Sequence, residues 1–343
     1  MDTPRVVVFD AGDEDDAARH LAQSVSEIGS STPLVVTSVH GEHLARKIHG
    51  ARFETPPEDA SIDWASILGA DAHRSGCDIV VAVGGGRCLD LAKLAAARAG
   101  LTMVSVPTQL SHDGLCSPVA VAPGHDGIKR SVGAIAPRSV YLSLPTLQKS
   151  PAASVRAGIG DLLANPFALR DWALAKERGL AEVDQVAWDM SERSYATIEP
   201  FLEIDLTDGL HDSAFLRSLA DALVLSGIAM IHSGSSRPAS GGEHEISHAL
   251  DELFGGPGMH GAQVAFGCIF SAALYGDDPG AVRKRLTKLG LPADPGALGL
   301  SHEDAVKVLL AAPDTRPGRF TIIEEAALDE SGAQRLVGEI WRP

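Results

Sequence analysis

The chain has few cysteines and no long apolar run, and each shortage excludes a class of protein. Its 343 residues include four cysteines, which are scattered and form no Cys-x-x-Cys pair. We therefore expect neither a disulfide framework nor a thiolate metal site, but a reducing compartment. No stretch approaches the ~18 consecutive apolar residues of a membrane span, and the N-terminus lacks the apolar segment of a signal peptide. A cytoplasmic protein without membrane insertion is expected.

Positive charge is also scarce. Lysine and arginine total 29 against 45 acidic residues, which gives a formal net charge of −16. This charge disfavours broad contact with nucleic acid or anionic lipid, and neither is expected as a partner. An anionic small-molecule substrate would need a local positive pocket that acts against the overall field.

What the chain does have is enough apolar sequence for a large core. Hydrophobic residues make up 45% of it, and the length suggests two domains. Before residue 150, short runs rich in valine and isoleucine alternate with helical patterns, which predicts a Rossmann-like α/β domain with a mostly parallel sheet. After it, helical periodicity dominates. We expect an α/β domain at 1–150 and an all-helical domain at 151–343.

Several elements can be assigned from these patterns. The expected strands are Val6–Phe9, Leu34–Thr37, Ile79–Val83, Met103–Val106 and Val140–Leu142. Residues 119–121 and 129–135 flank a Pro-Gly turn and predict an antiparallel hairpin. The first helices expected in the second domain are Ala152–Arg156, Asp161–Arg178 and Gln185–Ile204.

A run of glycines lies where the third expected strand meets a helix. Residues 84–86 carry no side chains, so backbone N–H groups can approach a diphosphate closely, and a helix N-terminus favours an anion. Leu89 stands where the ordinary Rossmann fingerprint needs its last glycine, so the match to that motif is incomplete. A tight strand–helix turn without a ligand is the alternative.

The next expected strand ends in a polar loop that contains Ser-His-Asp-Gly at 111–114. In open α/β sheets, ligands lie beyond the carboxyl ends of the strands. Because this loop and the glycine turn follow successive strands, we expect them to share a cleft. Taken alone, the loop is more typical of a solvated polar turn, and its proximity to the glycine turn is what favours a ligand site.

The histidines concentrate between residues 232 and 260. His244 and His248 are four residues apart, so on a helix they share a face, and His260 follows a Gly/Pro-rich loop that can return it to that face. Imidazole is a good ligand for zinc and related metals. The same stretch matches the H-E-x-x-H pattern of zinc metalloproteases with Glu245 as base, but that hypothesis leaves the glycine turn unexplained.

Asp161 is a candidate third ligand, although it also suits the N-cap of a following helix. One carboxylate and two imidazoles would leave a divalent ion with residual positive charge and an open position for a substrate oxygen. Such an ion can polarise a carbonyl or acidify an alcohol.

These motifs closely resemble those of one family, the NAD(P)-linked, metal-dependent sn-glycerol-1-phosphate dehydrogenases, within the dehydroquinate synthase-like and iron-containing alcohol dehydrogenase-like superfamily. The resemblance covers the chain from about residue 33 to its end. Its Ser-His-Asp-Gly and Arg-Pro-Ala-Ser-Gly-x-Glu-His-x-x-Ser-His motifs are the most specific. The matching stretches are residues 83–93, 105–118, 157–161, 171–175, 233–248, 260–263, 315–317 and 319–322.

The resemblance implies roles for individual residues. The cofactor-binding set it implies is Gly84, Gly85, Gly86, Arg87, Asp90, Thr108, Ser111 and Ser117. The metal ligands it implies are Asp161, His244 and His260. Asp113 and His248 would contact the substrate and serve in catalysis, and we place Arg237 near a phosphate.

The implied reaction is the reduction of dihydroxyacetone phosphate, or of a related phosphorylated ketone, by NADH or NADPH with a divalent metal, most suitably zinc. The first domain would bind the dinucleotide and the second the metal and substrate, in a homo-oligomer. Ser38 follows the second strand where an acid would exclude a 2′-phosphate, so neither cofactor is excluded.

Two departures from the family pattern bear on the substrate. Pro166 lies five residues after Asp161, where it predicts a kink or a late helix start, and Gly242 stands where the family often has serine. A sugar-phosphate cyclase of the dehydroquinate synthase type is the main rival, although such enzymes typically carry glutamate at the first metal position. A cofactor-binding scaffold or sensor without turnover is a further alternative.

Overall fold

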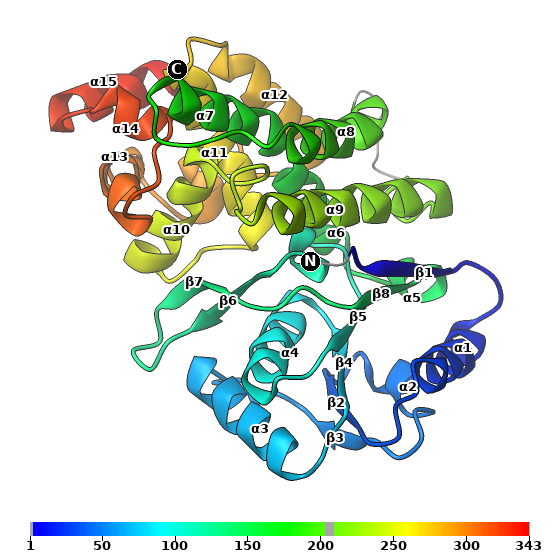
Figure 1. The fold of residues 1–343 in the computed structure, drawn as a ribbon. Helices are drawn as coiled ribbons and strands as arrows, with labels where there is room; N and C mark the ends of the chain where they lie inside the picture. The colour runs from blue at the N-terminus through cyan, green and yellow to red at the C-terminus, as the bar shows by residue number, and fades with distance from the viewer. Residues whose placement is uncertain (1–2, 203–208, 343) are drawn as a thin grey trace.

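The computed structural model describes residues 3–202 and 209–342, and it shows a parallel sheet flanked by helices with a separate helical layer beside it (Figure 1). The sheet has the order β1-β8-β5-β4-β2-β3, and every neighbouring pair is parallel. The strands are Arg5–Phe9 (β1), Pro33–Thr37 (β2), Arg52–Glu54 (β3), Ile79–Gly84 (β4), Met103–Pro107 (β5) and Ser139–Ser143 (β8). All five predicted strands are confirmed, and β3 was not predicted.

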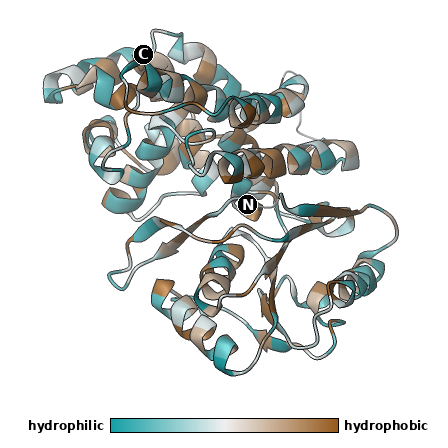
Figure 2. Cartoon of the chain, viewed as in Figure 1, coloured by the Kyte–Doolittle hydropathy of each residue, from teal (hydrophilic) through white to brown (hydrophobic). Residues whose placement is uncertain are grey.

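Helices cover both faces of this sheet. They are Glu14–Glu27 (α1) and Glu42–Ala45 (α2) on one face, and Ile62–Arg74 (α3) and Gly86–Ala99 (α4) on the other (Figure 1). In β2, Leu34 and Val36 pack beneath α3 and α4, whereas Val35 packs beneath α1 and α2. A strand buried on both faces needs apolar residues throughout, which is why the central strands are hydrophobic (Figure 2). Helix α1 lies on the outside of the sheet and is largely hydrophilic.

Beyond the sheet the described chain is helical. The helices are Leu144–Leu147 (α5), Ala152–Leu162 (α6), Asn165–Glu177 (α7), Gln185–Leu202 (α8), Ser213–Ser233 (α9), Gly242–Phe254 (α10), His260–Leu274 (α11), Pro279–Leu289 (α12), His302–Ala311 (α13), Ile322–Ala326 (α14) and Glu330–Ile340 (α15). The predicted helix end at Ile204 lies outside the described residues. Among the described helices, α9 alone is long and apolar enough to cross a membrane, but 67% of its apolar window is buried, as in a core helix.

One apolar core runs through both parts of the molecule. The same cluster of buried side chains includes Val36 of the sheet, Ile159 of α6 and Trp341 after α15. Trp341 packs its ring against Phe266 and Phe270, at centroid distances of 5.7 and 5.4 Å. The predicted fold class is confirmed, while the division into domains at residue 150 stays a prediction.

The predicted hairpin is confirmed as Val119–Pro123 (β6) paired antiparallel with Lys129–Gly133 (β7). Two buried residues of α4 fasten it. Lys93 Nζ donates to Val119 O at 2.7 Å, and Val121 N donates to Asp90 Oδ2 at 3.1 Å. The hairpin is thereby held against the helix that begins at the glycine turn.

The start of the second part differs from the prediction. The predicted helix Asp161–Arg178 is wrong at its start, because α6 continues to Leu162 and places Asp161 in its last turn rather than at an N-cap. The next helix begins at Asn165 with Pro166 in its first turn, where proline costs no hydrogen bond. This late start agrees with the expectation from Pro166.

Candidate active site

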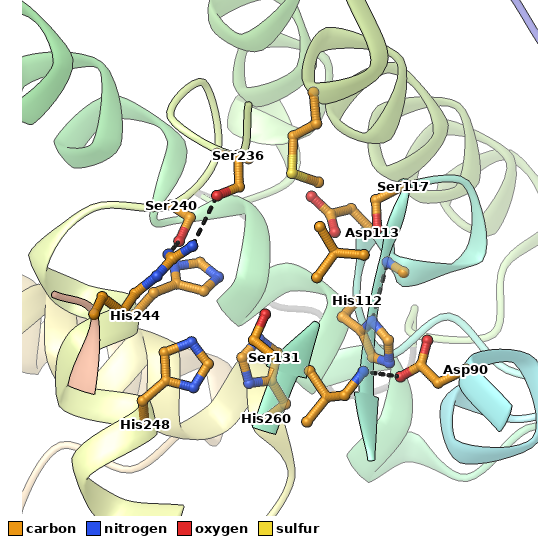
Figure 3. Close-up of a pocket in the computed structure, with 16 residues that line it drawn as sticks. Asp90, His112, Asp113, Ser117, Ser131, Ser236, Ser240, His244, His248 and His260 are labelled. Atoms are coloured by element: carbon orange, nitrogen blue, oxygen red, sulfur yellow. Dashed lines mark hydrogen bonds between the residues drawn. The ribbon is translucent and has the colours of Figure 1, made fainter. Parts of the chain in front are cut away.

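Three helices bring the predicted metal ligands together. Asp161 lies in the last turn of α6, His244 in the first turn of α10, and His260 is the first residue of α11. One ligand atom from each lies within 4.8 Å of the others. The Nε2 atoms of His244 and His260 are each 3.8 Å from Asp161 Oδ1, and the two rings face the same pocket (Figure 3). His248 is outside this group, so among the described residues no such cluster contains both histidines of the H-E-x-x-H pattern.

Glycines allow these helices to approach so closely. A Cβ at Gly160 would overlap the carbonyl oxygen of Gly261, and a Cβ at Gly261 would overlap that of Ala157. The glycines beside Asp161 and His260 in the sequence therefore permit α6 and α11 to touch through their backbones. That contact places the two ligands face to face.

Hydrogen bonds at the far side of each ring fix which nitrogen is free. His244 Nδ1 lies 3.0 Å from Glu243 Oε1, and His260 Nδ1 lies 3.1 Å from Ser247 Oγ. Ser247 Oγ in turn donates to Gln263 Oε1 at 2.8 Å, so it accepts from His260. Each Nδ1 thus carries the hydrogen, and each Nε2 presents a lone pair toward Asp161, as metal-ligating histidines do.

The protonation of these groups suits a cation. Burial lowers the pKa of His244 to about 3 and that of His260 well below its usual value, so both rings are neutral. Burial, followed by the charge of Asp113, raises the pKa of Asp161, and among the described residues no lysine or arginine pairs with its carboxylate. Two imidazole lone pairs and one carboxylate without a counter-ion are the donor set of a divalent metal.

The predicted substrate contacts line the same pocket. Asp113 accepts a hydrogen bond from Ser226 Oγ at 2.9 Å, and its backbone N donates to Asp161 Oδ2 at 2.8 Å. Burial raises the pKa of Asp113 to about 6. His248 faces the pocket one turn after His244, opposite Asp113 (Figure 3). The structure therefore groups Asp113 and His248 around the three ligand atoms.

The glycine turn opens a second, larger cleft of about 680 Å³. Gly85 precedes α4 and Gly86 is its first residue, so the helix N-terminus faces this space. Thr108, from the loop after β5, lines the same cleft, which confirms that the two loops share it. A Cβ at Gly86 would overlap His112 Nε2. His112 also lines the pocket around His244 and His260, which we call the metal pocket. His112 therefore lies between the glycine turn and this pocket.

Other residues of the predicted cofactor set lie elsewhere. Asp90 and Ser117 line the metal pocket rather than the cleft, and Asp90 is engaged with Lys93 and the hairpin. Ser111 is buried and lines neither cavity. Arg87 borders the cleft, but its guanidinium donates to the backbone carbonyls of residues 57 and 58. Gly84 lies at the end of β4, where a Cβ would overlap Cys88.

Residue-level reasoning missed several participants. His112 was noted only as part of its loop, yet its Nδ1 accepts from Gly114 N at 3.0 Å and its ring lies 5.8 Å from that of His260. Ser247, which hydrogen-bonds to His260, directly precedes His248 in the sequence, but the sequence does not show that its hydroxyl contacts His260. Nothing in the local sequence indicated that Arg316 would line the metal pocket, because its neighbours there are about 80 residues away.

A parallel sheet with a glycine turn, beside helices that present one aspartate and two histidines, defines the class of iron-containing alcohol dehydrogenase-like proteins. The iron-containing alcohol dehydrogenase family model matches residues 13–151. A probable glycerol dehydrogenase from Sinorhizobium meliloti has a similar structure, with a TM-score of 0.81 and 22% identity over 99% of this chain and 97% of that one. The glycerol dehydrogenase of Schizosaccharomyces pombe follows the same fold, with a TM-score of 0.76, 18% identity and coverage of 98% and 89%.

Sequence relatives specify the family. The NAD(P)+-linked glycerol-1-phosphate dehydrogenase of Hyperthermus butylicus is 35% identical over 98% of this chain and 97% of its own length. That of Staphylothermus marinus is 39% identical over 82% of this chain and 78% of its own length. The chain belongs to the glycerol-1-phosphate dehydrogenase family, and it is an NAD(P)-dependent oxidoreductase that acts on CH–OH groups.

Proposed function

We propose that this enzyme reduces C2 of dihydroxyacetone phosphate to give sn-glycerol 1-phosphate, with NADH or NADPH and a divalent metal. The observation that carries the proposal is the grouping of Asp161, His244 and His260 within 4.8 Å, beside a pocket whose wall residue His112 packs against Gly86 of the glycine turn. The relatives supply the substrate, since they are named as glycerol-1-phosphate dehydrogenases.

We assign different roles in the reaction to the residues around the pocket. A divalent ion held by the three ligands would polarise the C2 carbonyl, and a reduced nicotinamide would supply the hydride. Gly85, Gly86 and Thr108 line the space for the cofactor. Asp113, fixed by Ser226, orients the substrate hydroxyl. We assign proton delivery to the C2 oxygen to His248 and the hydroxyls beside it.

Zinc is the metal we propose, because two imidazole nitrogens and one carboxylate oxygen form a common catalytic zinc set; iron and nickel accept the same atoms. We propose that both NADH and NADPH are used. Ser38 lines the glycine cleft just after β2, where a carboxylate would repel a 2′-phosphate. A cytoplasmic homo-oligomer that binds neither nucleic acid nor membrane completes the proposal.

Oxidation of the reduced cofactor is the direct test. The metal-loaded protein should consume NADH or NADPH with dihydroxyacetone phosphate, more slowly with dihydroxyacetone, and not after treatment with a chelator. The product should resist oxidation by an sn-glycerol-3-phosphate-specific dehydrogenase, which reports its configuration. A cyclase would show no net oxidation, because it returns its cofactor unchanged. Absence of turnover with the whole panel of phosphorylated ketones would reject the proposed reaction.

A further inference from the structure

A basic pocket adjoins the metal pocket. Its cationic lining side chains are Lys129, Arg130, Arg237, Arg316 and Arg319. Glu252 is the one carboxylate among the lining residues. The two pockets share Ser131, His248 and Arg316 as wall residues, so a molecule at the metal ligands extends directly into the basic pocket. This is a local excess of positive charge in a chain whose formal net charge is −16.

Within the described part of the chain, the hydrogen-bond partners of Arg316 and Arg319 are all neutral. Arg316 donates to Ser240 Oγ and, at 2.9 Å, to Ser236 Oγ. Arg319 donates to Ser240 O at 3.0 Å and to Ser236 Oγ at 2.7 Å. Ser236 Oγ thus accepts from both guanidinium groups. Ser236 and Ser240 lie on the side of the metal pocket nearest His244 (Figure 3).

No carboxylate within the described residues pairs with either arginine. The cations nearer the rim differ, since Arg130 pairs with Asp126 at 2.6 Å and Lys129 with Asp251 at 3.4 Å. Burial lowers the pKa of Arg319 to about 9 and repulsion by the charge of Arg316 adds to this effect, whereas the charges of Glu245 and Glu243, which form no ion pair with it, oppose the shift without cancelling it. A partly buried guanidinium pair without a counter-ion is costly unless an anion binds there.

We propose that Arg316 and Arg319 bind the phosphate of the substrate and thereby select a phosphorylated ketone over a neutral one. This inference rests on the proposed function. Guanidinium groups offer paired N–H donors that match phosphate oxygens. Their shared acceptor, Ser236, fixes the spacing of the two guanidinium groups and keeps its own hydroxyl hydrogen for a phosphate oxygen. Arg237, which donates to Phe320 O at 3.4 Å, borders the same pocket.

Steady-state kinetics on two substrates separate recognition from a structural role. Arg316→Gln and Arg319→Gln should each lower kcat/KM for dihydroxyacetone phosphate by about 100-fold, because a buried charge contact is lost. The kcat/KM for unphosphorylated dihydroxyacetone should fall much less, because that substrate carries no phosphate. The control is Arg217→Gln, which removes an exposed arginine paired with Asp221 on α9 and should alter neither substrate. Equal losses on both substrates would overturn the proposal.

Binding of inorganic phosphate gives a readout that needs no turnover. The metal-loaded protein is saturated with NAD+ so that the glycine cleft is filled, and phosphate is then titrated by calorimetry. Wild-type protein should bind phosphate, and both variants should bind it about 100-fold more weakly while keeping the wild-type melting temperature. Wild-type protein that does not bind phosphate, or variants that bind it equally well, would overturn the assignment. Arginine-dependent phosphate binding without reduction of dihydroxyacetone phosphate would support the anion site and reject the proposed reaction.

Discussion

Ser247 shows how a single hydroxyl can determine the chemistry of a neighbouring ring. It accepts from His260 Nδ1 and donates to Gln263, which is itself held by Asp251 at 3.3 Å. The lone pair of His260 Nε2 therefore depends on a chain of side chains that never reach the pocket. Sequence patterns predicted the three candidate ligands but not this support, because hydrogen-bond direction depends on three-dimensional contacts.

Removal of that hydroxyl should weaken the metal site without removing a ligand. Ser247→Ala leaves His260 free to rotate and to change tautomer, so the affinity for zinc should fall about 10- to 100-fold. Competition with a chelating dye measures this affinity directly. Ser218→Ala is the control, since the hydroxyl of that half-buried serine donates to Ala214 O within its own helix α9 and lies outside the candidate metal site.

His244→Ala sets the lower limit of the same measurement, because it deletes a candidate ligand. This variant should lose its metal and its turnover while its circular dichroism stays that of wild type. Full metal occupancy in His244→Ala would reject the ligand set, and unchanged zinc affinity in Ser247→Ala would reject the role of the hydroxyl.

At the scale of elements, the sequence predicted the alternation of strands and helices. It did not predict the element boundaries that depend on tertiary contacts. The strands that became β2, β4 and β5 are apolar on both faces, so composition alone predicts them. The three-residue β3 has the sequence Arg-Phe-Glu and lies at the edge of the sheet, paired with β2. It is therefore too short and too polar to show the apolar run that predicts a buried strand. The extension of α6 through Asp161 depends on its packing against α11, through Gly160, rather than on propensity.

The glycine turn gives a prediction at this scale. In Gly85→Val, the new side chain would overlap the Gln109 amide and project into the cleft, so the dissociation constant of NADH should rise. Fluorescence titration of the reduced cofactor measures it. Gly338→Ala in α15 serves as the control because a Cβ there meets nothing within 4 Å. Cofactor affinity that is equal in both variants would count against the turn as a diphosphate site.

At the scale of the whole molecule, the C-terminus contributes to the shared core. Trp341 is buried against Phe266 and Phe270, and its indole N–H donates to Ala293 O at 3.1 Å. Trp341→Ala should lower the free energy of unfolding by about 3–5 kcal/mol, because it leaves a large cavity. Denaturant titration measures this loss.

The exposed Leu180 provides the comparison for Trp341. Leu180→Ala should change the free energy of unfolding by no more than about 0.5 kcal/mol, because this side chain is 59% exposed. A loss in Trp341→Ala as small as that in Leu180→Ala would show that the C-terminal helix adds little to the core.

The close contacts between the sheet and the helical layer limit how freely such enzymes can be recombined. A Cβ at Gly158 would overlap the carbonyl oxygen of Leu110, and a Cβ at Gly227 would overlap Ser117 N, so backbone meets backbone across the junction. A chimera that joins residues 1–150 of this chain to the helices of a distant relative would need small residues at both positions. Without small residues there, the candidate metal ligands would lie at the wrong distance from the site proposed for the nicotinamide, even if each half kept its own shape.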